Sequence, residues 1–292
     1  MTARLRIGIV GAGRAGLGLA AALRKTGHRI VAGMTRSAAS ARRAARHVPG
    51  ASWSTHFTES LRRADVILIC VPDDQVGAVA RSVLSGLPAR AVLLHLSGSL
   101  PSRILPGRRG AAAIGSLHPL YSFPPPGGAP ADLAGIWWAV GGAPRARAMA
   151  RRLARDLGGR AVLVPEPRRG SWHLAAALAA NHLVALLDAA AEMAARRVKL
   201  PRAQAEAMLV ALAASVLASA QRSGLRGALT GPIARGDIAT LRRHVALLAR
   251  EERSLRELYS LLGLRQVRMA GAQRRTSSGK MRRVLKATRR RR

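Results

Sequence analysis

Three glycines near the start of the chain have the spacing of a phosphate-binding loop. They belong to the stretch Gly11, Ala12, Gly13, Arg14, Ala15 and Gly16. The stretch follows the apolar residues 5–10 and opens an Ala/Leu-rich segment that ends near Lys25. A strand, such a loop and a helix in that order predict a dinucleotide-binding site. The first glycine makes the tight turn, the second lets the backbone approach a pyrophosphate, and the third lets the helix lie close to the strand. The N–H groups at the helix start would bind the phosphates; the alternative is an ordinary glycine-rich turn.

The residues after the second apolar run predict which dinucleotide is bound. About 20 residues past the glycines, NAD-binding domains usually place an Asp or Glu on the ribose 2′-hydroxyl. Here the residues are Thr35, Arg36 and Ser37, with no acid. An arginine and two hydroxyls suit a 2′-phosphate, because a guanidinium can bind it through two hydrogen bonds. We therefore expect NADP in preference to NAD; the alternative is that Arg36 is a solvated surface side chain.

Two further strand ends complete the expected cofactor site. The apolar runs 64–71 and 91–96 are typical of strands buried on both faces. We expect the residues that follow them, at the ligand-binding edge of an open α/β sheet, to contact the cofactor. These residues are Val71, Pro72, Ser97 and Gly98. Asp73 and Asp74 are interpreted as structural, with Asp74 capping the next helix.

Three polar residues are the candidates for chemistry on a substrate. His118 follows another apolar run, and imidazole exchanges protons near neutral pH. Asn181 interrupts an apolar helical segment and needs polar partners if it is buried. Arg235 stands in a Gly/Pro-rich turn and could bind a carboxylate or phosphate. The structural alternatives are a loop-fixing histidine, an asparagine bonded to a neighbouring helix, and a helix-terminus arginine. His173, near the helix face of Asn181, is a further candidate.

The pattern of elements predicts an α/β fold with a doubly wound, mostly parallel sheet in residues 1–166. Short apolar runs alternate with helical segments there, and the alternation stops near Glu166. Residues 167–270 are predicted to be an all-helical domain: one helix from a Ser171 cap to Val198, one beginning at Pro201, and one from an Asp237 cap to residue 262. Residues 271–292 are expected to be a disordered basic tail.

Composition limits the class of protein. The formal net charge is +35, and all 49 basic residues except Lys25, Lys199, Lys280 and Lys286 are arginine. Compositional drift and weak binding of polyanions by the tail both explain this excess. A single cysteine, Cys70, excludes an internal disulfide. Without a secretory signal or a charge-free apolar run long enough to span a bilayer, the protein is expected to be cytoplasmic, with no membrane partner and no metal site.

Several motifs together resemble a known family. They are the glycine loop, residues 115–120 (GSLHPL), residues 180–186 (ANHLVAL) and residues 229–237 (LTGPIARGD). These are similar to the Rossmann-like oxidoreductase family called domain of unknown function 2520. That family resembles the wider 6-phosphogluconate-dehydrogenase-like superfamily, which includes pyrroline-5-carboxylate reductase, ketopantoate reductase and prephenate dehydrogenase. The resemblance covers residues 5–263 and implies a nicotinamide domain followed by a helical domain that often dimerises. It supplies no substrate.

Two partial resemblances concern the site. Residues 117–120 (LHPL) are similar to the His-Pro-Met motif of prephenate dehydrogenases, whose histidine hydrogen-bonds the substrate hydroxyl that loses hydride. The continuation, residues 121–123 (YSF), departs from that pattern. The Lys-x-x-x-Asn motif of related hydroxyacid dehydrogenases is absent, since His173 and Asn181 stand in the corresponding segment without a lysine.

We therefore expect an NADP-dependent oxidoreductase that transfers a hydride between nicotinamide and a small anionic metabolite, a keto acid, a hydroxy acid or an imine. His118, Asn181 and Arg235 are expected to converge on one cleft of a homodimer. The alternatives are a non-catalytic NADP-binding or NADP-sensing protein, and a nucleic-acid-associated protein that acts through its basic tail.

Overall fold

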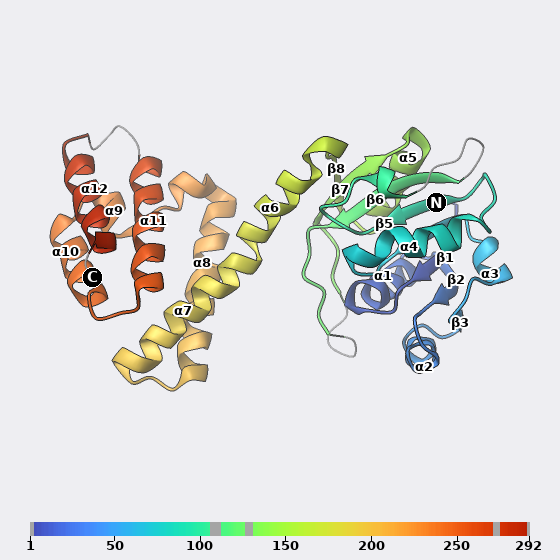
Figure 1. The fold of residues 1–292 in the computed structure, drawn as a ribbon, viewed down its shortest axis with the longest axis horizontal. Helices are drawn as coiled ribbons and strands as arrows, with labels where there is room; N and C mark the ends of the chain where they lie inside the picture. Colours follow the sequence, from blue (N-terminus) through green and yellow to red (C-terminus); the bar gives the residue numbers. More distant parts are fainter. Residues whose placement is uncertain (1–2, 106–111, 126–130, 271–274, 291–292) are drawn as a thin grey trace. The chain divides into compact units, whose positions relative to one another are not determined.

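The chain divides into two compact units, Met1–Ala179 and Ala180–Arg292 (Figure 1). The computed structural model describes residues 3–105, 112–125, 131–270 and 275–290. The division falls after the expected boundary at residue 166, because the helix that follows it packs with the first unit. Arg169 of that helix donates hydrogen bonds to the carbonyl oxygens of Ser97 and Leu100.

The first unit contains an eight-stranded sheet in the order β3-β2-β1-β4-β5-β6-β7-β8. The strands are β1 (Arg6–Val10), β2 (Arg29–Met34), β3 (Ser52–Ser54), β4 (Val66–Ile69), β5 (Val92–His95), β6 (Ala113–Pro119), β7 (Trp137–Gly142) and β8 (Arg160–Leu163). The run from β3 to β6 is parallel, β7 is antiparallel to β6, and β8 is parallel to β7. The order up to β6 is the doubly wound Rossmann order. The predicted α/β class is confirmed.

Helices cover both faces of this sheet. They are α1 (Arg14–Lys25), α2 (Ala38–His47), α3 (Glu59–Arg62), α4 (Asp73–Leu84) and α5 (Pro144–Asp156). Helix α6 (Arg169–Ala179) follows β8, and of its residues only Arg169 is buried. Buried residues of α1, α2 and α5 pack on one face and those of α3 and α4 on the other. Strand β4 shows why its sequence is continuously apolar: Val66 and Leu68 belong to the first cluster, whereas Ile67 and Ile69 belong to the second.

The second unit is helical in the part that the structure describes. Its helices are α7 (Asn181–Val198), α8 (Arg202–Gly227), α9 (Gly231–Arg235), α10 (Ile238–Leu248), α11 (Arg253–Met269) and α12 (Arg275–Arg290). The predicted Asp237 cap is confirmed, since its carboxylate accepts the Thr240 N–H at 2.9 Å. The predicted continuous helix to residue 262 is wrong. It ends at Leu248, and the turn before α11 presents Glu251 to Arg196 and Arg197.

The helix predicted between Ser171 and Val198 is also interrupted. Ala180 (φ −110°, ψ −70°) separates α6 from α7 as the N-cap of α7, and Ser171 lies inside α6. The expected start at Pro201 is close, because Pro201 is the N-cap of α8.

The prediction that residues 271–292 form a disordered tail is wrong for residues 275–290. These residues form α12, in which Met281, Leu285 and Thr288 are buried against α10 and α11. The physical reason is the spacing of these residues with Val284, which places them on one helix face. Residues 271–274 and 291–292 lie outside the described residues.

Helices α7 and α8 leave many apolar side chains exposed within the structure. These are Val184, Met193, Val198, Met208, Val210, Leu212, Val216, Leu217 and Leu225. In length and composition alone, the helical segments Glu166–Val198 and Arg202–Arg235 are apolar enough to cross a membrane. The structure therefore has an exposed apolar surface on these two helices.

Candidate functional site

The glycine loop joins β1 to α1 in a geometry that explains two of its glycines. Gly11 has φ +102°, and a Cβ there would lie 2.4 Å from the Cys70 carbonyl oxygen. A Cβ on Gly16 would lie 2.0 Å from the Gly11 carbonyl oxygen. Both positions therefore require glycine for the fold itself, as the sequence pattern predicts. Gly13 differs, because no atom lies within 4 Å of the place its Cβ would take.

The start of α1 is suited to an anion. Gly13 is the N-cap, no side chain of the described residues caps the helix, and the first turn contains no acid. The first N–H groups of a helix lack intrahelical acceptors and carry the positive end of the helix dipole. Ala12, Arg14 and Ala15 are partly or fully exposed around this opening. Val71, from the loop after β4, lies against Gly11.

The three residues predicted to select NADP have different roles. Thr35 is buried, and its hydroxyl donates to the Ser37 carbonyl oxygen at 3.0 Å. The Ser37 hydroxyl accepts the Ser40 N–H and caps α2. Arg36 is exposed, and no interaction of its guanidinium is found among the described residues. Arg36 is therefore the member of the three with a free charged group at this position.

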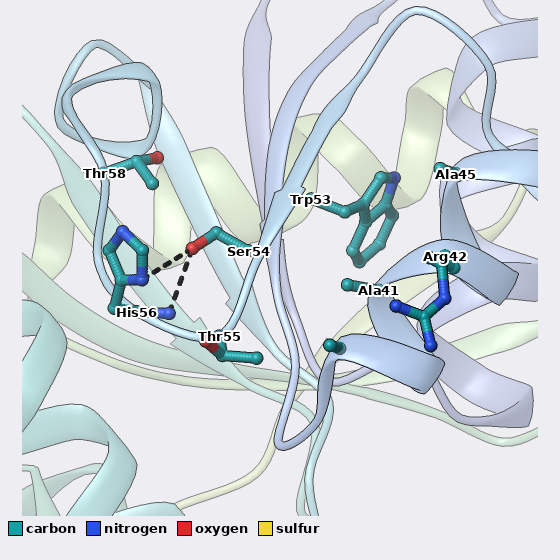
Figure 2. A pocket seen from close by; sticks show the side chains of 9 residues that line it. Ala41, Arg42, Ala45, Trp53, Ser54, Thr55, His56 and Thr58 are labelled. Atoms are coloured by element: carbon teal, nitrogen blue, oxygen red, sulfur yellow. Dashed lines mark hydrogen bonds between the residues drawn. The ribbon is translucent and has the colours of Figure 1, made fainter.

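A shallow pocket adjoins this segment between α2 and the loop after β3 (Figure 2). It is lined by Ala38, Ala41, Arg42, Ala45, Trp53, Ser54, Thr55, His56 and Thr58. The ring of Trp53 packs on Gly33, where a Cβ would lie 2.1 Å from it. Figure 2 shows Arg42 and His56 on opposite sides of Trp53. Ala38, which lines the pocket, directly follows Ser37. The pocket therefore adjoins the segment Thr35–Ser37 of the candidate cofactor site.

Two histidines meet over Gly98, which follows β5. A Cβ on Gly98 would lie 2.7 Å from His118 Nε2 and 2.6 Å from His173 Nδ1. The rings meet edge to face, with centroids 5.9 Å apart. The sequence predicts that Gly98 contacts the cofactor. The structure gives a reason for glycine at this position, because any side chain there would collide with both imidazoles.

Ser97 and Asp73 fix the loop that carries Gly98. The hydroxyls of Ser97 and Ser99 both donate to Asp73 Oδ2, at 2.8 and 2.6 Å, and Ser97 also accepts the Leu100 N–H. The structural interpretation of Asp73 thus agrees with its contacts. The expectation that Asp74 caps the next helix is wrong, because α4 begins at Asp73 with Pro72 as its N-cap and no side-chain cap in this described segment.

Sequence reasoning missed Arg169, which is fully buried beside the histidines. Its Nε donates to the Leu100 carbonyl oxygen and its Nη2 to the Ser97 carbonyl oxygen, both at 2.7 Å. Nothing in an arginine-rich sequence distinguishes this arginine from exposed ones. A Cβ on Gly141 would lie 3.2 Å from Arg169 Nη1 and 2.6 Å from Glu166 Oε1. Arg169 therefore connects α6 to the loop on which Gly98 lies.

Burial is the main influence on the protonation of His118. Burial, and after it the electrostatic interactions with His173 and Arg169, lower the pKa of His118 to about 4, and Asp73 opposes them. Burial, followed by the Arg169 charge, also lowers the pKa of His95 to about 3. His118 is consequently neutral at pH 7 and able to accept a proton or a hydrogen bond.

Asn181 and Arg235 belong to the second unit. Asn181 is the first residue of α7 and is exposed, so the premise of a buried asparagine is not met. Arg235 is the last residue of α9, is exposed, and precedes Gly236 at φ +75°. Their convergence with His118 stays a prediction.

A parallel sheet with an open glycine loop, followed by a helical unit, defines a two-domain protein of the Rossmann-like class. Residues 1–119 match the model of a Rossmann-like domain, and residues 136–266 match the family described as Domain of unknown function (DUF2520). The chain thus joins a Rossmann-like domain to a DUF2520 domain, and the family predicted from its motifs is confirmed.

Solved structures share this fold over nearly the whole chain. A Bacteroides fragilis protein described as a candidate NADP oxidoreductase is 23% identical, covers 96% of this chain and 98% of its own, and has a TM-score of 0.71. A Thermotoga maritima protein is 23% identical, with coverages of 97% and 100% and a TM-score of 0.64. Plasmodium falciparum pyrroline carboxylate reductase with NADP bound is 13% identical, with coverages of 96% and 98% and a TM-score of 0.59. No curated protein matches the sequence.

Proposed function

We propose that the protein is an NADP-dependent oxidoreductase that transfers a hydride between nicotinamide and a small anionic metabolite. One observation carries the proposal. The glycine loop and the pair His118 and His173 lie at the same edge of one parallel sheet, because β1, β4, β5 and β6 all end there. Ligands of open α/β sheets bind at that edge.

The residues at this edge fit a nicotinamide dinucleotide. The open space at Gly13 leaves room for the pyrophosphate. The N–H groups at the uncapped start of α1 are available to donate hydrogen bonds to it. The exposed guanidinium of Arg36 provides a partner for a 2′-phosphate, and Arg42 lines the adjoining pocket. The bound cofactor would supply the hydride chemistry. The fold shared with an NADP-bound pyrroline carboxylate reductase agrees with this assignment.

His118 has the position and protonation state of a proton acceptor. Its Nε2 faces the space over Gly98, and its lowered pKa, about 4, keeps the ring neutral at pH 7. In the oxidising direction, a neutral imidazole accepts the proton of the hydroxyl or amine on the carbon that loses hydride. Asn181 and Arg235 are assigned to substrate orientation and to binding of the anionic group, respectively.

Single-turnover oxidation of NADPH tests this function. The protein is loaded with NADPH and mixed with a panel of small keto acids and cyclic imines, and the loss of reduced-nicotinamide absorbance is followed. At least one compound should oxidise the cofactor, and His118→Asn should lower the rate while leaving NADPH affinity close to wild type. Tight NADPH binding without oxidation by any compound would contradict an enzyme and favour an NADP-binding or NADP-sensing protein.

The apolar surface of α7 and α8 is assigned to a second copy of this chain. Val184 and Leu212 are 68% and 59% exposed in the isolated chain. Large exposed apolar patches are rare on monomers and mark interaction sites. A homodimer would bury it without a further partner, whereas insertion in a membrane is the competing use of the same residues.

A further inference from the structure

Helix α12 has a fixed orientation in the second unit. Met281, Leu285 and Thr288 are at most 1% exposed, and the Ser260 hydroxyl donates to the Leu285 carbonyl oxygen at 2.8 Å. A Cβ on Gly263 would lie 2.7 Å from Leu285, so α11 and α12 are in close contact. Figure 1 shows α12 beside α10 and α11. Because one face is held in the core, the opposite face is presented to solvent in a defined arrangement.

The exposed part of the helix is positively charged. Arg283 and Lys286 lie opposite the buried residues, Lys280 and Arg282 lie on the two flanks, all four are exposed, and residues 275–290 contain no acidic residue. We call these side chains the cationic face of α12. No hydrogen bond or ion pair of these side chains is found within the described part of the chain.

The acidic residues of the second unit are engaged elsewhere. Glu251 pairs with Arg196 and Arg197. Arg202 pairs with Asp188 and Glu206, and Arg253 with Glu257. Arg196, Arg197, Arg202 and Arg253 are thus locally compensated, whereas the four side chains of the cationic face of α12 have no acidic partner among the described residues. Its charge is therefore available to an anionic partner.

We propose that the cationic face of α12 binds the phosphate backbone of double-stranded nucleic acid without sequence specificity. At a rise of 1.5 Å per residue, Lys280 to Lys286 covers about 9 Å of helix. Four charges over that length approach the density of a duplex, which carries one negative charge per about 1.7 Å of its axis. In the sequence the basic character continues through Arg289, Arg290, Arg291 and Arg292.

The chemistry of α12 favours a duplex over two other polyanions. Its apolar residues are buried in the second unit, so the helix has no apolar face to insert among lipid tails. Residues 275–290 include no aromatic residue, so they offer no surface on which unpaired bases stack. Phosphate contacts from lysine and arginine remain, and these are the contacts that hold a protein on a duplex regardless of sequence.

Fluorescence anisotropy with a short labelled DNA duplex tests the proposal on the full-length protein. Binding is measured over a series of salt concentrations for wild type and for the variant Lys280→Gln, Arg282→Gln, Arg283→Gln, Lys286→Gln. The wild-type affinity should fall steeply with salt. The variant should bind at least about tenfold more weakly, and its salt slope should be flatter by about 3.6, since each phosphate contact contributes about 0.9.

A matched control separates a local site from the net charge of the chain. Arg24, Lys25, Arg46 and Arg81 are exposed cations of the first unit, and their replacement by Gln removes the same charge. This control should keep most of the affinity and the slope. Equal weakening by both variants would overturn the proposal and leave compositional drift as the explanation.

Further measurements define the outcome. The half-variants Lys280→Gln, Arg283→Gln and Arg282→Gln, Lys286→Gln should each show an intermediate slope. Thermal unfolding of the quadruple variant, followed by circular dichroism, should match wild type, which verifies that the second unit is folded. Stronger binding to single-stranded polyuridylate than to the duplex would overturn the assignment to a duplex. Binding to phosphatidylserine vesicles without binding to the duplex would replace it with a membrane surface.

Discussion

At the scale of single residues, the pKa of His118 depends on its burial and on its charged neighbours. Burial disfavours the charged form of its ring, and the interactions with His173 and Arg169 add to this effect against the opposing carboxylate of Asp73. The folded protein therefore holds the ring neutral at a pH where the unfolded chain would protonate it. A folded-state pKa below the unfolded value means that His118 destabilises the fold as the pH falls from about 6.5 toward about 4.

Replacement of His173 by Gln should raise the pKa of His118, because it removes a positive neighbour. NMR titration of the His118 ring in wild type and variant measures the shift directly. An unchanged pKa in His173→Gln would mean that the two rings are not coupled.

Replacement of His118 by Asn should reduce the loss of unfolding free energy between about pH 6.5 and pH 4, a range set by the unfolded-state and folded-state pKa values of His118.

Replacement of Gly13 by Val should abolish stabilisation by NADPH and leave the unliganded protein as stable as wild type. The valine has open space in the fold but would occupy the path of a pyrophosphate. Thermal unfolding with and without NADPH measures both effects. Gly16→Val is the matched control, because its Cβ would meet the Gly11 carbonyl oxygen and should lower the unfolding temperature without any ligand. Normal NADPH binding by Gly13→Val would mean that the loop is only a turn.

Replacement of Arg36 by Ala should narrow the difference between NADPH and NADH. Wild type should be stabilised more by NADPH at equal concentration, because the exposed guanidinium can bind the 2′-phosphate. The loss should affect NADPH alone, since NADH lacks that phosphate. Equal stabilisation of wild type by both cofactors would contradict the predicted preference.

At the scale of elements, the local sequence predicts those that are bounded by their own signals. The apolar runs of β1, β2, β4 and β5 are readable because each is buried on both faces. The short edge strand β3 has no apolar run, because Trp53 stands between two serines. Trp53 packs on Gly33 of the neighbouring strand β2. The sequence does not predict helix α12, because the few apolar residues of its buried face stand among many arginines and lysines. Arg169 was missed because burial of an arginine is decided by distant carbonyl oxygens.

Replacement of Leu285 by Ala should destabilise the second unit by about 2–5 kcal/mol, the usual cost of truncating a fully buried leucine. Leu285 is 0% exposed and contacts the core formed with Ile233, Leu241 and Val267. Chemical unfolding followed by circular dichroism measures the change. Leu247→Ala, at a residue 66% exposed in the same unit, should cost less than about 0.5 kcal/mol. Equal effects of the two changes would show that α12 is not packed in solution.

At the scale of the whole molecule, the order of the predicted elements indicates the fold class but does not indicate the oligomeric state. Alternating strands and helices followed by helices alone were sufficient for the α/β class and the order of the two domains. The apolar character of the segment that contains α7 is readable from the sequence, but what covers it is not, because a helix that is apolar over most of its circumference has the same sequence whether it is buried within one chain or between two. The cytoplasmic location also stays a prediction.

Replacement of Leu212 by Glu should convert a dimer into a monomer. Leu212 is 59% exposed in the chain, so a charge there should not disturb the fold but should oppose burial against a second copy. Light scattering after size-exclusion chromatography in detergent-free buffer measures the mass. Leu247→Glu, 66% exposed on α10, is the control and should remain dimeric. A wild-type monomer that needs detergent to stay dispersed would contradict the dimer and favour a membrane.

The contact of two imidazoles over Gly98 also has a consequence for inheritance. A side chain at position 98 would displace the rings of His118 and His173 from the positions they hold here, so the three residues constrain one another. A homologue that lacks the histidine at position 118 or 173 has room for a side chain at position 98, whereas a homologue with both histidines requires glycine there. Among descendants of a common ancestor, residues 98, 118 and 173 should therefore change together, and their joint pattern should separate those that retain this chemistry from those that have adopted another.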